Sequence, residues 1–412
     1  MSERKTVTKL YAGRYQRATK REKAVILTEF LSLTKYNRCY GAWLLRHQGK
    51  RVTVSPQKIV EGDVSKSTPR VRSAYYDQAV KTALVKVWSL MDGVCSKRLA
   101  PALPKLIPKL ESCGELKLKA SVREKLMKLS SATIDRLLAE ERAALGSGKK
   151  VGHTKPGGLL KHQIPIRTFA DWNEQQPGFA ELDLVGHEGG NARGDFCFTL
   201  DVTDVFSGWT ETRGIQNKAQ VWVVEALDRI RQGLPFSLQG IDSDNGSEFI
   251  NEQLVRYCQQ HRLTFTRSRS GRKNDNCFVE QKNYSVVRRA VGYRRYDTSE
   301  QLSLLNDLYD RLRLYTNYFL PVMKLREKTR TGSKVSKKYD KAQTPCERLL
   351  ASDKLSELQK EHLREEYERL NPGQLKREIE RFQEQLLKSV NQTDRTAKSR
   401  RVTTSSPTTA RL

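Results

Sequence analysis

The sequence predicts a chain of several domains: an all-α N-terminal region, a central α/β domain on a mixed five-stranded sheet, and a basic, helical C-terminal region. Three observations predict this organisation. The 412 residues are enough for two to four domains. Residues 180–185 and 195–202 alternate between apolar and polar side chains, which is the period of a half-buried strand. Residues 20–47 and 298–319 carry their apolar side chains at helical spacing.

Residues 1–60 are predicted to form a helix-turn-helix unit. Thr19 and Glu22 form a capping box before the first helix, and a short turn at 34–36 leads to a second helix over about 37–47. Two helices joined by a tight turn suit insertion into the major groove of DNA. Trp43, Leu44 and Leu45 are expected to point inward. The outward residues expected to contact DNA are Asn37, Arg38, Tyr40 and Arg46.

Residues 70–145 are also predicted to be helical and to contain a second helix-turn-helix. Ser121 and Glu124 read as a capping box, and 130–145 reads as the second helix, in which Thr133 and Arg136 are expected to face DNA. A plain helical bundle would give a similar pattern, so that alternative stays open. Residues 146–170 are rich in Gly and Lys and are predicted to be a flexible linker.

The central domain is predicted over residues 171–297. Its elements are expected in the order three strands, helix, strand, helix, strand, helix, which gives a mixed sheet covered by helices. The first and fourth strands can be neighbours in such a sheet. The predicted elements are strands at 180–185, 195–202 and 208–213, a helix at 217–233, a strand at 237–242, a helix from near 248, a strand at 263–267, and a helix carrying Glu280.

Three acidic residues occupy informative places in this domain. Asp183 lies on the first strand, Asp244 follows the fourth beside an Asn-Gly turn, and Glu280 lies on the last helix, with 35 residues between the last two. Carboxylates held close together repel one another unless a cation lies between them. Mg²⁺, for which Mn²⁺ could substitute, is a hard cation that takes oxygen ligands. A pair of such ions, two per active site, is a device for in-line attack at a phosphodiester.

Other polar residues nearby leave alternatives open. Asp242 competes with Asp244 for the second position, but the Asn-Gly turn favours Asp244. Asp201 and Asp204 are expected to be solvated or to lie in turns. His187, four residues after Asp183, could lie near metals or substrate, or could be a structural histidine.

The three acidic motifs carry a family resemblance. With Asp183 in ELDLVGH, Asp244 in SDNGSEF and Glu280 in NCFVEQKN, residues 175–295 resemble the integrase catalytic core. That core is a ribonuclease H-like fold shared by retroviral integrases and bacterial insertion-sequence transposases. The flanking segments 20–45, 129–138 and 317–350 are similar to those of a bacterial DDE transposase with such a core.

This resemblance implies a polynucleotidyl transferase that cleaves at transposon ends and transfers the strands into target DNA. It implies that the three acidic residues hold the metal ions, and that the protein acts as a homo-multimer on double-stranded DNA in the bacterial cytoplasm, associated with the nucleoid. Residues on or beside the last helix of the core are expected to hold substrate phosphates. They are Lys282, Asn283, Arg288 and Arg289.

The region 298–390 is predicted to be basic and helical, beginning with a capping box at Thr298 and Gln301. From Lys324 to Lys341 there are eight Lys or Arg residues and two acids. Lys334, Lys337 and Lys338 are expected to bind DNA phosphates, although a solvated basic loop is the alternative. Residues 391–412 are polar and basic and are predicted to be disordered.

Composition limits the classes of function independently. The 75 Lys and Arg residues exceed the 47 Asp and Glu residues and give a net charge of +28, which favours a polyanionic partner. No apolar run has the length of a membrane span, and the N-terminus lacks the apolar core of a signal peptide. The seven scattered cysteines indicate reduced thiols. Two alternatives remain: a ribonuclease H-like nuclease that only cleaves, such as a resolvase, and a non-enzymatic DNA-binding regulator.

Overall fold

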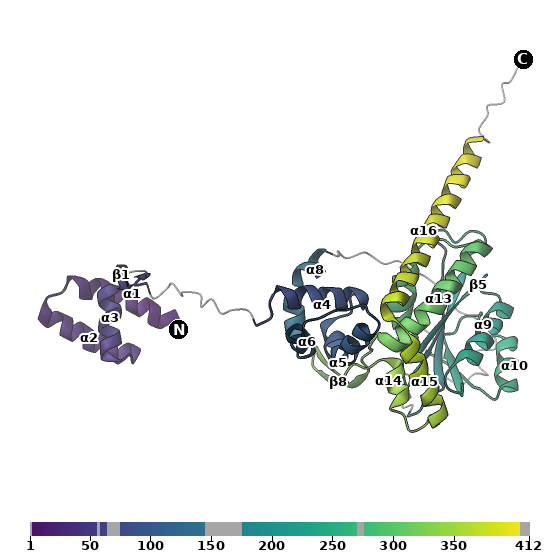
Figure 1. The fold of residues 1–412 in the computed structure, drawn as a ribbon, viewed down its shortest axis with the longest axis horizontal. Helices are drawn as coiled ribbons and strands as arrows, with labels where there is room; N and C mark the ends of the chain where they lie inside the picture. Colours follow the sequence, from purple (N-terminus) through teal and green to yellow (C-terminus); the bar gives the residue numbers. More distant parts are fainter. Residues whose placement is uncertain (1, 56–57, 64–74, 145–174, 270–275, 404–412) are drawn as a thin grey trace, which may run out of the picture. The chain divides into compact units, whose positions relative to one another are not determined.

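The computed structural model describes residues 2–55, 58–63, 75–144, 175–269 and 276–403. Contacts divide the chain into two compact units, Met1–Tyr75 and Tyr76–Leu412, which are described separately (Figure 1). The linker predicted at 146–170 lies outside the described residues.

The first unit contains the predicted pair of helices, α2 and α3, together with elements that the sequence analysis did not predict. The Thr19–Glu22 capping box is present, with the Thr19 amide donating to Glu22 Oε2 over 2.7 Å. A preceding helix and a β-hairpin complete the unit, so the prediction of an all-α region is wrong. The hairpin segment RVTVS alternates and is rich in β-branched residues, which favour strands. The elements are α1 (Ser2–Arg17), α2 (Lys20–Thr34), α3 (Arg38–His47), β1 (Arg51–Ser55) and β2 (Lys58–Glu61).

The second unit is built around the predicted mixed five-stranded sheet, whose spatial order is β5-β4-β3-β6-β7. β4 is antiparallel to both of its neighbours, β3 and β5, whereas β6 and β7 continue the sheet parallel to β3. The first and fourth strands of the domain are therefore neighbours, as expected. The strands are β3 (Phe179–Gly186), β4 (Phe198–Asp204), β5 (Thr210–Ile215), β6 (Gly240–Ser243) and β7 (Thr264–Arg267).

One face of the sheet is apolar and packs against two helices, α9 (Gln220–Gly233) and α10 (Glu252–Gln260). Alternation along each strand directs every second side chain to this face. α10 begins at Glu252, where Asn251 caps it, and not near residue 248 as predicted. The buried sheet residues on this face are Ala180, Leu182, Leu200, Val202 and Ile241.

The opposite face of the sheet is polar, yet most of it is buried. It lies against α11 (Cys277–Lys282), the π-helical segment η3 (Asn283–Arg288) and α13 (Ser299–Phe319), and α12 (Arg289–Val291) follows η3 and contacts α16 (Pro372–Thr403). Asp201 and Asp204, for which the sequence predicts solvated or turn positions, are 0% and 2% exposed. Asp204 does close a turn, because its Oδ2 accepts from the Ser207 amide over 2.7 Å. The capping box of α13 at Thr298 and Gln301 is confirmed.

The predicted second DNA-binding region contains five helices, and four of them, α4 to α7, contribute buried residues to the core of this unit. Tyr315 on α13 donates to the Leu90 carbonyl over 2.5 Å, and Lys376 pairs with Asp92 at 2.8 Å. The helix predicted at 130–145 is broken at Leu138 into two short helices. The helices are α4 (Gln78–Leu90), α5 (Ser96–Ser112), α6 (Ala120–Met127), α7 (Ser131–Leu137) and α8 (Ala139–Ala144).

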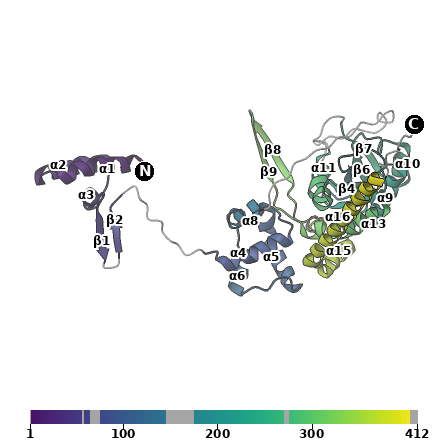
Figure 2. The ribbon, with the colours of Figure 1, turned by 90° about the horizontal axis from the view of Figure 1, so that it is seen from above.

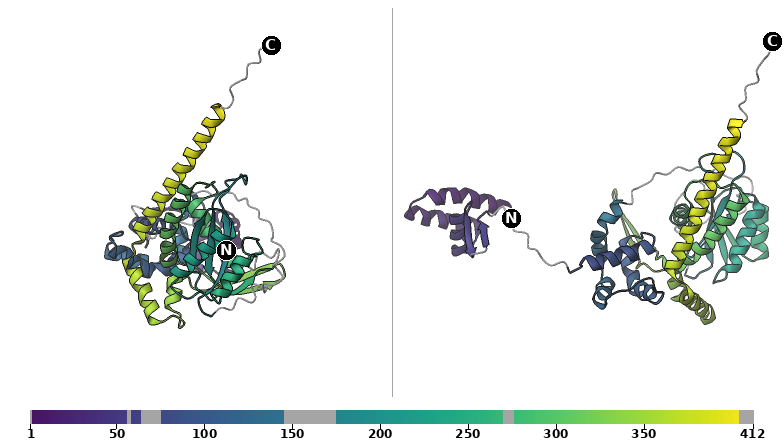
Figure 3. Two further views of the ribbon diagram at one scale, coloured as in Figure 1. Left: turned by 90° about the vertical axis from the view of Figure 1, so that its right-hand side faces the viewer. Right: turned by 45° about the horizontal axis from the view of Figure 1, so that its top comes forward.

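The C-terminal region is helical, as predicted, but its basic segment is a β-hairpin and not a loop. The last helix continues to Thr403. The disordered tail predicted for 391–412 stays a prediction, and residues 404–412 lie outside the described part. Figure 3 shows the end of this helix extending away from the sheet. The elements are β8 (Leu325–Thr331), β9 (Lys334–Tyr339), α14 (Pro345–Leu350), α15 (Glu357–Arg369) and α16 (Pro372–Thr403).

Among the described residues, no helix combines the length and the apolar character that a membrane span needs.

Candidate active site

Asp183 lies on β3, and Asp244 is the first residue after the neighbouring parallel strand β6, at the same level of the sheet. Leu182 of β3 is in register with Ser243 of β6, and each acidic residue is the next one along its chain. The amide of Gly246 donates to Asp244 Oδ1 over 2.9 Å, which fixes the turn that the Asn-Gly pair predicts. Both acidic side chains are half-buried. The sheet topology therefore brings together two residues that are 61 positions apart.

Glu280 is carried by α11 and is exposed. The start of this helix is fixed by a buried acidic residue of β3: the Val279 amide donates to Glu181 Oε2 over 2.9 Å. Glu181 thus supplies the acceptor that an orphan amide of the first helical turn needs. Burial raises the pKa of Glu181 well above its ordinary value. Sequence analysis missed Glu181, whose positioning role depends on how α11 packs on the strand.

Electrostatic repulsion indicates that Asp244 and Glu280 lie near Asp183. Burial is the largest of the effects that raise the pKa of Asp183 to about 7, and the negative charges of Asp244 and Glu280 contribute to the same shift. Burial also raises the pKa of Asp244. Asp242, the competing residue, is fully buried within β6 and is hydrogen-bonded by Thr266. This arrangement favours Asp244 over Asp242 as the second member of the site.

Within the described residues, no group of three or more His, Cys, Asp or Glu side chains is arranged to hold a metal ion as it stands. The donor atoms nevertheless suit a hard cation, because all three are carboxylates. A fourth oxygen-bearing side chain lies beside Asp183: Asn283 donates to Asp183 Oδ2 over 2.6 Å, and its own buried Oδ1 has no hydrogen-bond partner among the described atoms. Mutual repulsion keeps uncompensated carboxylates apart, so binding a cation requires side-chain rearrangement.

Replacing Asp183 with Asn is expected to stabilise the metal-free protein at neutral and alkaline pH. A carboxyl whose pKa rises on folding, here from 3.8 to about 7, binds more protons in the folded state between these values. Its contribution to stability therefore falls as the pH rises through that window. We expect Asp183→Asn to increase the free energy of unfolding by roughly 1–2 kcal/mol at pH 8, discounted for solvent screening, and by almost nothing near pH 4.

Denaturant unfolding in EDTA at both pH values measures this difference. Glu252→Gln is the matched control, because Glu252 is an exposed acidic residue paired with Arg256 on α10. Equal stability of wild type and Asp183→Asn at pH 8 would contradict the repulsion inferred at Asp183.

Lys282 does not face solvent, contrary to the expectation that it holds DNA phosphates. Its side chain is 9% exposed, and its Nζ donates to the Gly208 carbonyl over 3.2 Å. Burial lowers the pKa of Lys282 to about 8, while the nearby Asp201 carboxylate acts in the opposite direction. Burial raises the pKa of Asp201, and Lys282 opposes that shift. Lys282 therefore compensates a buried acid beneath the site.

The other residues expected to hold phosphates near Glu280 make contacts within the unit. Asn283 binds Asp183, as described above. Arg288 donates to the Gly186 carbonyl over 2.8 Å and lies over the Tyr293 ring at 4.6 Å. Arg289 is exposed and forms an ion pair with Asp92 at 2.7 Å. These bonds brace the helical segment that follows Glu280.

His187 has a structural role. It is fully buried, and its Nε2 lies 2.7 Å from Thr199 Oγ1, which in turn lies 2.7 Å from Tyr309 Oη. Burial lowers the pKa of His187 to about 3, so the ring is neutral at physiological pH. Of the two alternatives that the sequence left open for His187, the geometry supports a structural histidine.

A hollow of about 450 Å³ lies at the start of α9, next to the loop that follows Asp244. Its lining combines an exposed cation, Lys218, with Ser247 and Glu248. Sequence analysis did not select Lys218, since an isolated lysine before a helix carries no pattern. The hollow gives a surface of mixed polar and apolar character on the Asp244 side of the site.

In the first unit, α3 presents most of the predicted DNA-contact residues to solvent. Asn37, Arg38, Tyr40 and Arg46 are exposed, and Asn37 also caps the helix by accepting from the Cys39 amide over 2.9 Å. Trp43, expected to point inward, is 38% exposed and stacks on His47 at 5.0 Å between ring centroids. The exposed face of α3 is thus both basic and aromatic.

The residues expected to contact DNA in the second unit differ in their exposure to solvent. Thr133 is buried, with its Oγ1 3.0 Å from Ser130 Oγ and accepting from Arg136 over 3.2 Å, so it does not face DNA. Arg136 itself is exposed, as are Lys334, Lys337 and Lys338 on the β8–β9 hairpin.

No known protein-family profile matches the chain. The chain is 39% identical over 348 residues to protein y4rM of Sinorhizobium fredii (strain NBRC 101917 / NGR234), covering 84% of this chain and 95% of y4rM. This chain belongs to the y4rM family. Because y4rM is described as an uncharacterized protein, membership of the y4rM family brings no activity with it.

Solved structures similar to this y4rM-family chain include three retroviral proteins. The catalytic core domain of BIV integrase is 15% identical, covers 42% of this chain and 95% of that domain, and gives a TM-score of 0.29. The HTLV-2 integrase catalytic core domain in complex with magnesium is 13% identical over 35% of this chain and 89% of that one, with a TM-score of 0.27. A simian T-cell lymphotropic virus intasome chain is 15% identical, covers 45% of this chain and 60% of that one, and gives a TM-score of 0.27. At these scores the likeness assigns no activity to the y4rM family.

Proposed function

We propose that this y4rM-family protein is a DNA transposase or integrase, a polynucleotidyl transferase that cleaves at the ends of a mobile element and joins them to target DNA. One observation carries the proposal. Asp183, Asp244 and Glu280 are distant in sequence, but they lie close enough for Asp244 and Glu280 to raise the pKa of Asp183. Such concentrated negative charge, on an otherwise basic chain, suits divalent cations and a DNA substrate.

Different residues of the chain would bind the metal ions and position the residues that bind them. Asp183 and Asp244 would hold one Mg²⁺ ion, and Glu280 with Asp183 would hold a second, with Mn²⁺ as a substitute. Such ions, when bound, activate a water or hydroxyl nucleophile and stabilise the leaving oxygen of the phosphodiester. Asn283 orients the Asp183 carboxylate, and Glu181 fixes the start of the helix that carries Glu280.

Other parts of the chain would bind the substrate. The exposed face of α3 in the first unit is proposed to recognise element ends, with its Arg and aromatic side chains in the major groove. The net charge of +28 supplies attraction to phosphates that weakens with salt. Joining two ends to one target needs at least two active sites, so a homo-multimer on DNA is part of the proposal. Its expected location is the bacterial cytoplasm, associated with the nucleoid.

A strand-transfer assay tests this function. Duplex oligonucleotides copied from the DNA flanking the coding sequence, one set with a pre-cut 3′ end, are incubated with a target plasmid in Mg²⁺, Mn²⁺ or EDTA. We expect joined products with either metal and none in EDTA. Metal-dependent nicking without joining would instead indicate a resolvase-like nuclease, and binding without nicking would indicate a regulator.

A further inference from the structure

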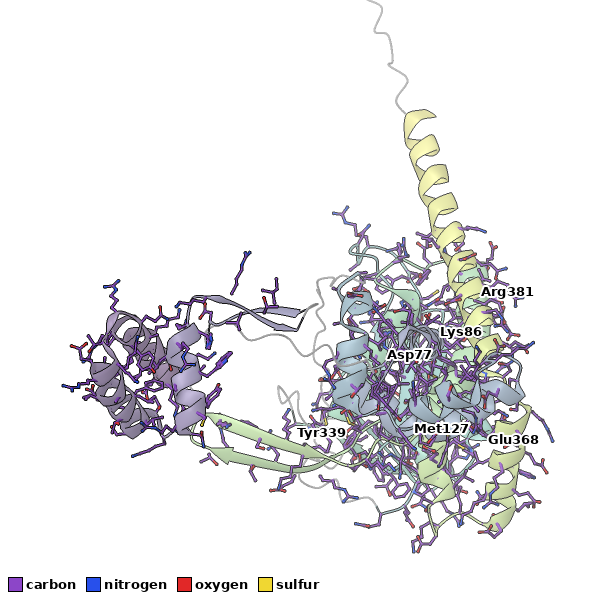
Figure 4. The ribbon with its side chains drawn as sticks, turned by 60° about the vertical axis from the view of Figure 1, so that its left-hand side comes forward. Asp77, Lys86, Met127, Tyr339, Glu368 and Arg381 are labelled. Carbon is purple, nitrogen blue, oxygen red and sulfur yellow. The ribbon has the colours of Figure 1, made fainter. Side chains whose placement is uncertain are left out.

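The basic segment after α13 forms a two-stranded ribbon, β8–β9, that stands out from the rest of its unit (Figures 2 and 4). The strands pair from Leu325↔Tyr339 to Thr331↔Lys334, leaving a two-residue turn at 332–333. Gly332 has φ +61°, a conformation that tight hairpin turns require and that glycine adopts without strain. Side chains along both strands are exposed, apart from Leu325 at the base.

The register sorts the side chains of this ribbon onto two faces. Residues directly opposite each other share a face, and successive residues alternate. Lys328 pairs with Lys337 and Arg330 pairs with Val335, while Arg326 is the extra residue of a bulge. The cationic face comprises Lys328, Arg330, Val335, Lys337 and Tyr339. The opposite face comprises Glu327, Thr329, Thr331, Lys334, Ser336 and Lys338.

The two faces differ in charge. The cationic face has three positive side chains and no acidic one, and among the described residues these three form no ion pair. The opposite face has two lysines and one glutamate, and Lys338 Nζ lies 2.8 Å from Glu327 Oε2. One face therefore carries a charge of +3 and the other +1, that is two lysines less one glutamate. The amino-acid sequence, read as a basic run, does not show this difference.

The base of the ribbon is firmly attached to the sheet domain. The Lys324 amide donates to Asp340 Oδ1 over 2.7 Å, and Arg348 pairs with Asp340 at 2.7 Å. Lys324 Nζ donates to the Phe206 carbonyl over 2.7 Å, at the turn between β4 and β5. Asp340, the other acid of this segment, is thus neutralised at the base and adds no negative charge to the ribbon's exposed length.

We propose that the cationic face of β8–β9 binds the phosphate backbone of double-stranded DNA and that the opposite face does not. The choice of DNA as partner rests on the proposed function. A two-stranded ribbon fits the major groove, and residues two apart on a strand are separated by roughly 6.6 Å. Tyr339 and Val335, 48% and 41% exposed on the same face, add contact area beside the cations. An isolated hairpin is marginally stable in water, so a bound partner would also stabilise this one.

Two double variants with equal loss of charge test the proposal. K328Q/K337Q removes two cations from the cationic face, and K334Q/K338Q removes two from the opposite face. The full-length proteins are titrated with a fluorescent 30-base-pair duplex in EDTA over a series of salt concentrations. We expect K328Q/K337Q to weaken binding roughly 10- to 60-fold near 0.1 M salt and to lower the salt slope by about 2, since each phosphate contact contributes about 0.9. K334Q/K338Q should change affinity less than about twofold.

Other results would overturn the proposal. Equal losses in both variants would show that only total charge matters, and no loss in either would show that the ribbon does not bind DNA. If single-stranded DNA bound the cationic face as tightly as the duplex does, the proposal that the partner is double-stranded DNA would be rejected. Unchanged thermal unfolding of both variants, expected because all four lysines are exposed, confirms that folding is unaffected. Binding in EDTA needs no catalysis, so this result is independent of any failure in strand transfer.

Discussion

Replacing Asp183 with Asn, Asp244 with Asn, or Glu280 with Gln is expected to lower end cleavage and strand transfer by roughly 10³-fold or more in each case. Each substitution keeps the shape of the side chain but removes the negative charge that would hold a divalent ion. The ions are worth several kcal/mol of charge stabilisation, and every ~1.4 kcal/mol is a factor of ten in rate. DNA binding measured in EDTA should stay within about twofold of wild type, because the lost charges are negative and repel phosphate.

The matched controls for these variants are two further acidic residues. Glu252→Gln removes an exposed charge from α10, where its ion pair with Arg256 is a surface contact, and should leave joining unchanged. Asp242→Asn tests the competing assignment at the second position. Activity above about a tenth of wild type in any of the three site variants would reject that residue's role. Loss in Asp242→Asn together with survival of Asp244→Asn would move the second position to Asp242.

Local periodicity allowed much of this site to be predicted. Alternation predicted β3 and β4, and the capping pairs Thr19–Glu22 and Thr298–Gln301 predicted two helix starts that the structure confirms. These signals depend on residues close in sequence. The neighbouring positions of β3 and β6 followed from the order of elements, because a mixed sheet of this order has few arrangements.

The residues that were mispredicted depend on packing between distant segments. Asp201 and Lys282 read as solvent-facing charges, whereas the polar face of the sheet is covered by α11 and η3, which bury both. The π-helical turn of η3 adds one residue per turn relative to an α-helix and accompanies the contact of Asn283 with Asp183. Periodicity does not reveal such a turn, since the apolar pattern on either side stays helical.

The β8–β9 ribbon did carry a signal in its sequence. Gly332-Ser333 is a favoured two-residue turn between two runs of similar length. The many lysines in this segment are poor strand formers, so the sequence analysis did not predict two strands here. The helices of the region 76–144 were assigned to DNA binding for a related reason. An apolar stripe predicts that a helix packs against something, but it does not identify the segment that the helix packs against.

Deleting residues 1–75 is expected to leave a folded second unit, whereas deleting residues 1–145 should prevent folding. The helices α4 and α5 contribute Leu84, Trp88, Leu103 and Ile107 to a core that also contains Tyr315 of α13. Each buried apolar side chain is worth roughly 1.5–3 kcal/mol, and the loss of a dozen or more exceeds a typical stability of about 5–15 kcal/mol. The first unit has its own core around Phe30 and Leu45, so the second unit keeps its core when residues 1–75 are removed.

Size-exclusion chromatography and thermal unfolding compare the two truncated proteins, and footprinting on the flanking DNA then locates end recognition. The protein lacking 1–75 should unfold cooperatively near the temperature of the full-length chain but lose its footprint, because α3 with Arg38, Tyr40 and Trp43 is gone. A soluble, cooperative protein lacking 1–145 would contradict the shared core. A footprint that survives loss of 1–75 would place recognition in the second unit, where Arg136 and the β8–β9 ribbon are the exposed cationic candidates. The two deletions therefore separate a unit that is proposed to bind DNA from a helical region that the sequence alone assigned to DNA and that the structure assigns to the core.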